Sequence, residues 1–147
     1  MAEVVLGEQA STLGLGERLV VESAGVAAEV GFDLDRRARK ALERRSYRPR
    51  VHRAQQFQPR WLDEFDLVIA MDRGHLRWLE RHAPKDPYKA EVRLFLSYPS
   101  AQTPSDEVRE VPDPYYGDER GFEACLDLIE LGCTSLLAEL APELAAG

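Results

Sequence analysis

The segment DLVIAMDRGHL, residues 66–76, decides the fold class of this 147-residue chain. Its four consecutive residues of buried type, 67–70, predict a strand that is covered on both faces, as strands of parallel sheets are. Asp72 follows at the N-cap position of a predicted helix over 72–83, which Pro84 stops. Because this strand leads directly into a helix, the segment indicates a β-α-β unit of an α/β protein.

Helices and strands alternate along the rest of the chain as well. The predicted helices cover 1–13, 33–46, 58–65, 72–83 and 122–140, the predicted strands cover 18–24, 66–71 and 91–98, and a long loop covers 99–121. This order predicts a three-layer α/β domain, with a parallel sheet of three strands and helices on both faces. No strand leads into the first helix, so we expect a single domain over 1–147 that is incomplete at its N-terminus.

The composition of the chain argues against several classes of function. A net charge of −7 argues against general binding of nucleic acid. No run approaches the roughly 18–20 apolar residues of a membrane span, and no signal-peptide pattern is found. The two cysteines form no disulfide framework, so we expect a reducing cytoplasm. Basic residues gather between positions 36 and 60, which predicts a solvated helix face or, alternatively, a docking surface for polyanions or phosphoproteins.

The sharpest chemical feature is VPDPYYGDE, residues 111–119. Asp113 precedes a proline, which favours an extended backbone on a loop, and Tyr115 and Tyr116 follow. A carboxylic acid beside two aromatic rings suits a general acid that faces an aryl substrate, because apolar neighbours raise its pKa and the rings can stack on the leaving group. The alternative is an Asp-Pro turn whose tyrosines pack against the domain.

Three further polar residues are candidates for the site. Ser23 and Asp72 each stand at the carboxyl end of a predicted strand, where α/β proteins bind ligands. The alternatives are a turn residue for Ser23 and a helix N-cap for Asp72. His52 lies in the loop VHRAQQF, where we expect a buried histidine that forms hydrogen bonds.

The remaining histidines and the cysteines predict neither a metal site nor a nucleophile. His75 and His82 share a predicted helix, but they lack the nearby third ligand of a zinc site. Cys125 and Cys133 lie in the apolar stripe of the last predicted helix and are interpreted as core residues. Neither cysteine has an arginine six positions later, and the chain has no glycine-rich phosphate loop of the Walker type.

In DPYYGD, together with MAE, VESAG, VHRAQQF and FDLVIAMDRGHL, the chain resembles the low-molecular-weight protein tyrosine phosphatases. The resemblance runs in order from residue 1 to about residue 140. Members of that family begin with a strand of the type VLFVC, continue with a Cys-x5-Arg-Ser/Thr phosphate loop, and often have a methionine before AE. This chain begins at that methionine. The resemblance therefore implies that the first strand and the loop with its nucleophilic cysteine and arginine are absent from it, through a late start codon or a truncation.

The resemblance also implies a fold and a reaction. The fold is of the phosphotyrosine protein phosphatase I type, whose sheet has four strands in the family and three here. The reaction is hydrolysis of a phosphotyrosine-containing protein or an aryl phosphate through a phosphocysteine intermediate, with no cofactor. Asp113 matches the general acid that protonates the leaving oxygen and then acts as a base toward water. Tyr115 and Tyr116 match the aromatic residues beside the site.

Other matches and departures concern the surroundings of the site. Ser23 and His52 match groups that hold the phosphate loop in shape, and Asp72 matches the acidic residue that opens the helix after the third strand. Glu22 stands where the family has an aspartate, and Gln55 stands where it has an arginine. An aromatic residue that walls the pocket in the family is replaced within VAAEVG, a change that bears on substrate preference.

Three functional hypotheses remain open at this point. The first is a tyrosine phosphatase whose 147 residues, as given, are inactive because they lack the nucleophile. The second is a non-catalytic interaction module derived from the same fold. The third is an arsenate reductase, which is disfavoured because residues 71–84 contain none of the redox cysteines that such enzymes carry after the third strand. No feature of the sequence selects a physiological substrate or an oligomeric state.

Overall fold

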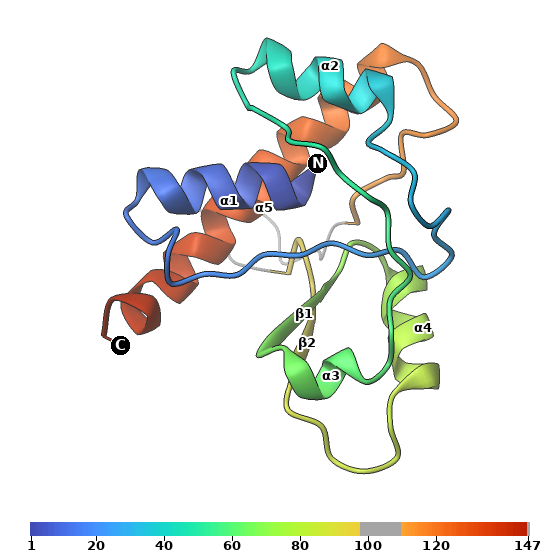
Figure 1. Cartoon of the computed structure of the whole chain (residues 1–147), viewed down its shortest axis with the longest axis vertical. Coiled ribbons are helices and arrows are strands. Elements are labelled where there is room, and N and C mark those ends of the chain that lie inside the picture. Colours follow the sequence, from blue (N-terminus) through green and yellow to red (C-terminus); the bar gives the residue numbers. More distant parts are fainter. Residues whose placement is uncertain (98–109, 147) are drawn as a thin grey trace.

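The computed structural model describes residues 1–97 and 110–146, in which five helices flank a parallel pair of strands (Figure 1). In chain order the elements are α1 (Ala2–Thr12), α2 (Arg36–Arg44), α3 (Trp61–Glu64), β1 (Leu67–Ala70), α4 (Arg73–His82), β2 (Glu91–Leu94) and α5 (Glu119–Ala146). Residues 98–109, which we predicted to end a strand and begin a long loop, lie outside the described residues. The predicted fold class, an α/β domain with a parallel sheet, is confirmed.

One face of the sheet packs against α3 and α4. β1 and β2 pair in parallel, with Val68 opposite Val92 and Ala70 opposite Leu94. Because side chains alternate along a strand, these four residues share one face of the sheet. On that face they join the apolar residues of α3 and α4 in one hydrophobic cluster. In Figure 1 both helices lie beside the sheet on the side away from α1 and α5.

The opposite face of the sheet contributes to a larger core that it shares with α1, α2 and α5. Ile69 and Met71 contact this larger core, and Phe95, which follows β2, is buried in it. Of the α5 residues predicted to form an apolar stripe, Leu140 is only half-buried, and the others are buried, namely Phe122, Cys125, Leu126, Ile129, Cys133, Leu136 and Leu137. The interpretation of both cysteines as core residues is therefore confirmed, and the predicted helices on both faces of the sheet are present.

Residues 18–24 do not form the predicted third strand. They run past the other elements as a segment without regular structure (Figure 1), and Val20 is 78% exposed. Side-chain exposure still alternates from Leu19 to Gly25, as it does in a strand. A strand requires backbone hydrogen bonds to a neighbouring strand. In the described residues, this segment is followed only by an isolated parallel bridge between Gly25 and Gln56. The sheet of the described residues has two strands, so the prediction of three is wrong.

Two aspartates cap the first turns of helices, and the cap at Asp72 was predicted. Asp35 Oδ1 accepts a 2.7 Å hydrogen bond from the backbone N–H of Arg37 at the start of α2. Asp72 Oδ1 accepts a 2.7 Å hydrogen bond from the backbone N–H of His75 at the start of α4. Such caps satisfy N–H groups that the first turn of a helix otherwise leaves without a partner.

α5 is the longest element of the described chain. It has 28 residues and extends beyond the predicted range of 122–140 at both ends. α1 packs along it, so that one side of α5 belongs to the core. Neither α5 nor any other helix in the described ranges combines the length and the apolar character needed to cross a bilayer.

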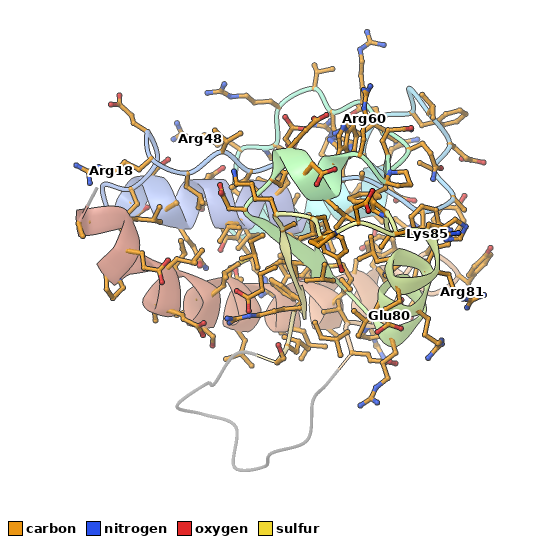
Figure 2. The ribbon with its side chains drawn as sticks, turned by 90° about the horizontal axis from the view of Figure 1, so that it is seen from below. Arg18, Arg48, Arg60, Glu80, Arg81 and Lys85 are labelled. Atoms are coloured by element: carbon orange, nitrogen blue, oxygen red, sulfur yellow. The ribbon has the colours of Figure 1, made fainter. Side chains whose placement is uncertain are left out.

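The basic stretch between positions 36 and 60 divides into two parts. Arg45, the residue after α2, forms ion pairs with three acidic side chains of α5. Arg48 and Arg60, which Figure 2 labels, lie exposed at the surface, and Arg60 forms a solvent-exposed ion pair with Glu64. Lys40 and Arg44 also pair with acidic side chains of α5, whereas Arg37 and Arg39 pair with Asp35 and Asp33. The prediction of a solvated basic face thus holds for only part of the stretch.

Candidate functional site

The loop that carries Asp113 passes the carboxyl end of β1. The backbone N–H of Val111 donates a 3.0 Å hydrogen bond to the carbonyl oxygen of Met71, the residue after β1. Glu110 Oε1 accepts a 2.9 Å hydrogen bond from the backbone N–H of Arg73 at the start of α4. Asp113 therefore follows a segment that is anchored at the sheet edge where α/β proteins bind their ligands.

Asp113 itself is exposed to solvent. Its Oδ1 accepts a 3.0 Å hydrogen bond from the backbone N–H of Tyr115, a local turn that orients the carboxylate. The rings of Tyr115 and Tyr116 meet edge to face with their centroids 5.2 Å apart, and the residues are 53% and 94% exposed. The tyrosines therefore neither bury the carboxyl group nor pack into the core, and a ligand can reach the carboxyl group from solvent.

Arg37 of α2 binds this loop. Its Nη1 donates a 2.8 Å hydrogen bond to the carbonyl oxygen of Gly117, and its Nη2 donates a 2.9 Å hydrogen bond to that of Tyr115. The Cζ atom lies 4.6 Å from the ring centroid of Phe122. Asp35 pairs with the same guanidinium, and these hydrogen bonds raise the pKa of Arg37 and lower the pKa of Asp35 from their ordinary values.

A second cluster forms at the first turn of α1. The Ser23 hydroxyl donates a hydrogen bond to Glu3 Oε2, and His52 Nδ1 lies 3.7 Å from the same oxygen. The backbone N–H of His52 donates a 3.1 Å hydrogen bond to Asp33 Oδ1. Glu3, Ser23 and His52 are all half-buried, so the expectation of a buried His52 is only partly met. The structure joins Ser23 and His52 through the Glu3 carboxylate, which the sequence prediction omitted.

The pKa of the Cys125 thiol lies above its ordinary value. Burial is the main cause, and the Asp113 carboxylate raises it further. Burial also raises the pKa of Cys133 to about 12. Both groups are free thiols in the core, whereas a nucleophilic cysteine needs a lowered pKa and access to its substrate.

Asp72 lies at the carboxyl end of β1 as predicted, and its side chain caps the first turn of α4. Besides the cap on the His75 backbone, its Oδ2 lies 3.3 Å from His75 Nδ1. Within residues 1–97 and 110–146, no hydrogen bond joins Asp72 to Asp113, and no group of three His, Cys, Asp or Glu residues is arranged to bind a metal ion. The N-cap interpretation of Asp72 is confirmed.

Sequence reasoning missed Glu3 and Arg37. A signal existed for Glu3, which stands within the segment MAE in the first turn of a predicted helix. No local signal existed for Arg37, because its loop partners are backbone carbonyls 78 and 80 residues further along the chain.

Comparisons with known proteins agree on one family. The family model described as low molecular weight phosphotyrosine protein phosphatase matches residues 1–146. A low molecular weight protein-tyrosine-phosphatase of Streptomyces coelicolor is 42% identical over 139 residues, which are 94% of this chain and 83% of that protein. A putative low molecular weight protein-tyrosine-phosphatase of Synechocystis is 40% identical over 144 residues, which are 97% of this chain and 88% of that protein.

Solved structures show the same similarity. The crystal structure of a protein tyrosine phosphatase from Entamoeba histolytica matches with a TM-score of 0.85 and 28% identity, over 97% of this chain and 88% of that chain. The crystal structure of YfkJ from Bacillus subtilis matches with a TM-score of 0.81 and 30% identity, over 97% of this chain and 86% of that chain.

Proposed function

This chain belongs to the low molecular weight phosphotyrosine protein phosphatase family, and from that premise we propose that it serves the hydrolysis of phosphotyrosine in proteins through a phosphocysteine intermediate. The observation that carries the proposal is the placement of Asp113. Its carboxyl group is open to solvent on a loop that is anchored at the carboxyl end of β1. A carboxyl group in this position is accessible to the leaving oxygen of a phosphotyrosine or of another aryl phosphate.

Asp113 acts in both steps of the reaction. In the first step a thiolate attacks phosphorus, the bond from phosphorus to the tyrosine oxygen breaks, and Asp113 gives its proton to that oxygen. In the second step the Asp113 carboxylate accepts a proton from the water that attacks the phosphocysteine, and phosphate leaves while the thiolate is restored. Tyr115 and Tyr116, whose rings are exposed, pack against the phenyl ring of the substrate.

We expect the cluster of Glu3, Ser23 and His52 to support the phosphate-binding loop. The Ser23 hydroxyl and His52 meet one carboxylate oxygen of Glu3, which limits the orientations of all three side chains. Asp72 supports the site indirectly, because it caps the start of α4 at the carboxyl end of β1.

Neither cysteine among the 147 residues supplies the thiolate. Both are buried with raised pKa values, and neither begins a Cys-x5-Arg motif. Such a loop surrounds phosphate with backbone N–H groups and an arginine, so the 147 residues by themselves are expected to hydrolyse no phosphotyrosine. The two free cysteines favour a cytoplasmic location, where thiols stay reduced.

A non-catalytic role is the second candidate. The burial of both thiols favours it, because the chain can then present its exposed tyrosines and Asp113 to a phosphotyrosine protein without attacking the phosphate. The two candidates differ in whether the scaffold supports turnover once a nucleophile is present.

The test compares the 147-residue chain with a chimaera in which a strand and a Cys-x5-Arg loop of the family pattern precede Met1. We expect the chimaera alone to hydrolyse a phosphotyrosine peptide and p-nitrophenyl phosphate, with inhibition by orthovanadate. The same chimaera with serine at the loop cysteine is the matched control and should be inactive. A folded chimaera without turnover contradicts the phosphatase proposal, and saturable binding of the phosphotyrosine peptide by the chain then supports the non-catalytic role.

A further inference from the structure

We propose that Arg37 is the positioning residue of the Asp113 loop. Its guanidinium holds the carbonyl groups of Tyr115 and Gly117 against α2 and thereby fixes the Asp113 carboxyl group for proton transfer. The inference rests on the proposed function for the role of Asp113. The contact itself is present whether or not the protein is a phosphatase, so the two can be tested separately.

The geometry of Arg37 leaves little freedom to its guanidinium. Nε and Nη2 donate to the two carboxylate oxygens of Asp35 at 3.2 and 2.9 Å, and the loop carbonyls of Gly117 and Tyr115 accept from Nη1 and Nη2 at 2.8 and 2.9 Å. Four of the five N–H groups of the side chain are therefore engaged. The Cζ atom of the guanidinium lies over the Phe122 ring of α5, 4.6 Å from the ring centroid.

Asp35 orients the Arg37 side chain toward the loop. Its Oδ1 accepts both the backbone N–H of Arg37, as the N-cap of α2, and the Arg37 Nε–H, while its Oδ2 accepts from Nη2. One carboxylate therefore fixes the start of the helix and the orientation of the arginine fork. The fork then points its remaining donors at the loop before any ligand arrives.

Tyr115 connects the arginine to the acid. Its carbonyl oxygen accepts from Arg37 Nη2, and its backbone N–H donates to Asp113 Oδ1. The other hydrogen bond of the turn, from the Gly117 N–H to the Pro114 carbonyl, is local to the loop. Within residues 1–97 and 110–146, the hydrogen bonds from Arg37 are the ones that tie this exposed turn to the body of the protein, so their loss should release the Asp113 carboxylate as well.

Lysine is a poor substitute at this position. Its ammonium group is a compact point charge and lacks the planar fork that serves two carbonyls and two carboxylate oxygens at once. Arg37→Lys therefore keeps the positive charge and most of the aliphatic side chain but loses the planar arrangement of N–H donors. Arg36→Lys is the matched control, because Arg36 is adjacent on the same helix, is exposed, and takes part in no ion pair with another described residue.

The primary test measures amide exchange with water by 15N NMR in the 147-residue chain. Arg37→Lys should accelerate exchange of the Tyr115 amide by roughly tenfold or more, because charge-assisted hydrogen bonds to the loop are lost. Exchange in α2 and α5 should stay unchanged, and Arg36→Lys should resemble the parent protein. Unchanged exchange at Tyr115 overturns the inference, and so does an equal acceleration throughout α2 and α5, which indicates general destabilisation.

Chemical rescue separates positioning from a merely structural role. Arg37 lines a solvent-open depression of about 370 Å³ together with Asp35, Arg36 and Lys40, so small ions can enter the space that Arg37→Ala vacates. Guanidinium ions, at a concentration far below that which unfolds proteins, should restore the protection of the Tyr115 amide in Arg37→Ala. Ammonium ions at the same concentration should not. Equal rescue by both ions contradicts the need for a planar fork.

Turnover by the chimaera described above supplies the second readout. Arg37→Lys should lower kcat for a phosphotyrosine peptide at unchanged KM, and it should lower kcat for p-nitrophenyl phosphate by a smaller factor. In a chimaera that already carries Asp113→Ala, Arg37→Lys should not lower kcat any further. If Tyr115 exchange responds as expected but the chimaera shows no turnover, the loop contact is upheld and the proposed phosphatase function fails. If the chimaera is active and neither exchange nor kcat responds to Arg37→Lys, the inference fails and the function stands.

Discussion

The ring of Phe95 lies directly against Gly132, so that α5 approaches the end of β2 without an intervening side chain. A Cβ atom added to Gly132 would overlap the near edge of the Phe95 ring. Phe95 is itself buried in the core that α1, α2 and α5 form with the sheet. This contact therefore sets how closely the longest helix approaches the sheet.

The first prediction concerns this close approach. Gly132→Ala should lower the free energy of unfolding by about 1–3 kcal/mol, because an extra carbon in a packed core forces its neighbours to move. Gly7→Ala in α1 is the control. It has no atom within 4 Å of the added Cβ and should gain up to about 1 kcal/mol from helix propensity. Urea unfolding measures both, and a gain in stability at Gly132 would contradict the packing argument.

The second prediction concerns the ion-pair network between α2 and α5. Arg45→Met keeps the apolar stem but removes the ion pairs to Glu123, Asp127 and Glu130, and should lower the free energy of unfolding by roughly 1 kcal/mol. The loss should shrink in 1 M salt because these side chains are partly exposed. Arg60→Met, which removes a solvent-exposed pair with Glu64, should change stability by less than about 0.5 kcal/mol. Equal losses of unfolding free energy for the two variants would show that the network stabilises the protein no more than a single exposed ion pair does.

The third prediction concerns the two buried thiols. At pH 8 and without denaturant, Ellman's reagent should label Cys125 and Cys133 only as fast as the protein opens, because both thiols are buried and protonated. Single-cysteine variants report each site, and the labelling rates should rise with urea. Immediate labelling of either thiol in the native protein would refute the assignment of both cysteines to the core and would reopen the question of a nucleophile.

The fourth prediction concerns acid stability. The Arg37 hydrogen bonds lower the pKa of Asp35 from its ordinary 3.8 in the folded protein, so the unfolded chain binds more protons near that pH. The stabilising contribution of Asp35 is therefore fully present above about pH 4 to 5 and is lost as pH falls through the lowered pKa. Asp35→Asn retains an N-cap, but its melting temperature should fall less steeply below about pH 4 than that of the parent. Parallel pH profiles for the two proteins would show that this pair does not contribute.

The fifth prediction concerns Asp113 in the chimaera. Asp113→Ala should lower kcat for phosphotyrosine by about 10²- to 10⁴-fold, because a general acid assists departure of a phenol whose pKa is near 10. The loss should be smaller for p-nitrophenyl phosphate, whose leaving group is more acidic. Both rates are measured at a temperature where both proteins stay folded. Equal losses for the two substrates, or a change of only a few-fold, would favour the interpretation of Asp113 as a turn residue.

Several features were predictable because they depend on residues close together in the chain. The N-caps at Asp35 and Asp72 each bind an N–H two or three residues further along. The apolar stripe of α5 follows from its helical period, and β1 follows from a run of four apolar residues. Residues 18–24 have the composition and the alternating exposure of a strand, yet they form none in the described structure because no neighbouring strand pairs with them.

By itself, the sequence determined the order of the helices and the parallel α/β class, and it predicted a site at the DPYYG loop, because helix periods, caps and turns depend on near neighbours. Only the tertiary structure decided that Arg37 holds the carbonyls of that loop and that Glu3 joins Ser23 to His52. These contacts join segments 20 to 80 residues apart. They form only when the core brings α1, α2 and the loop before α5 together, and this packing cannot be predicted from patterns of neighbouring residues in the sequence.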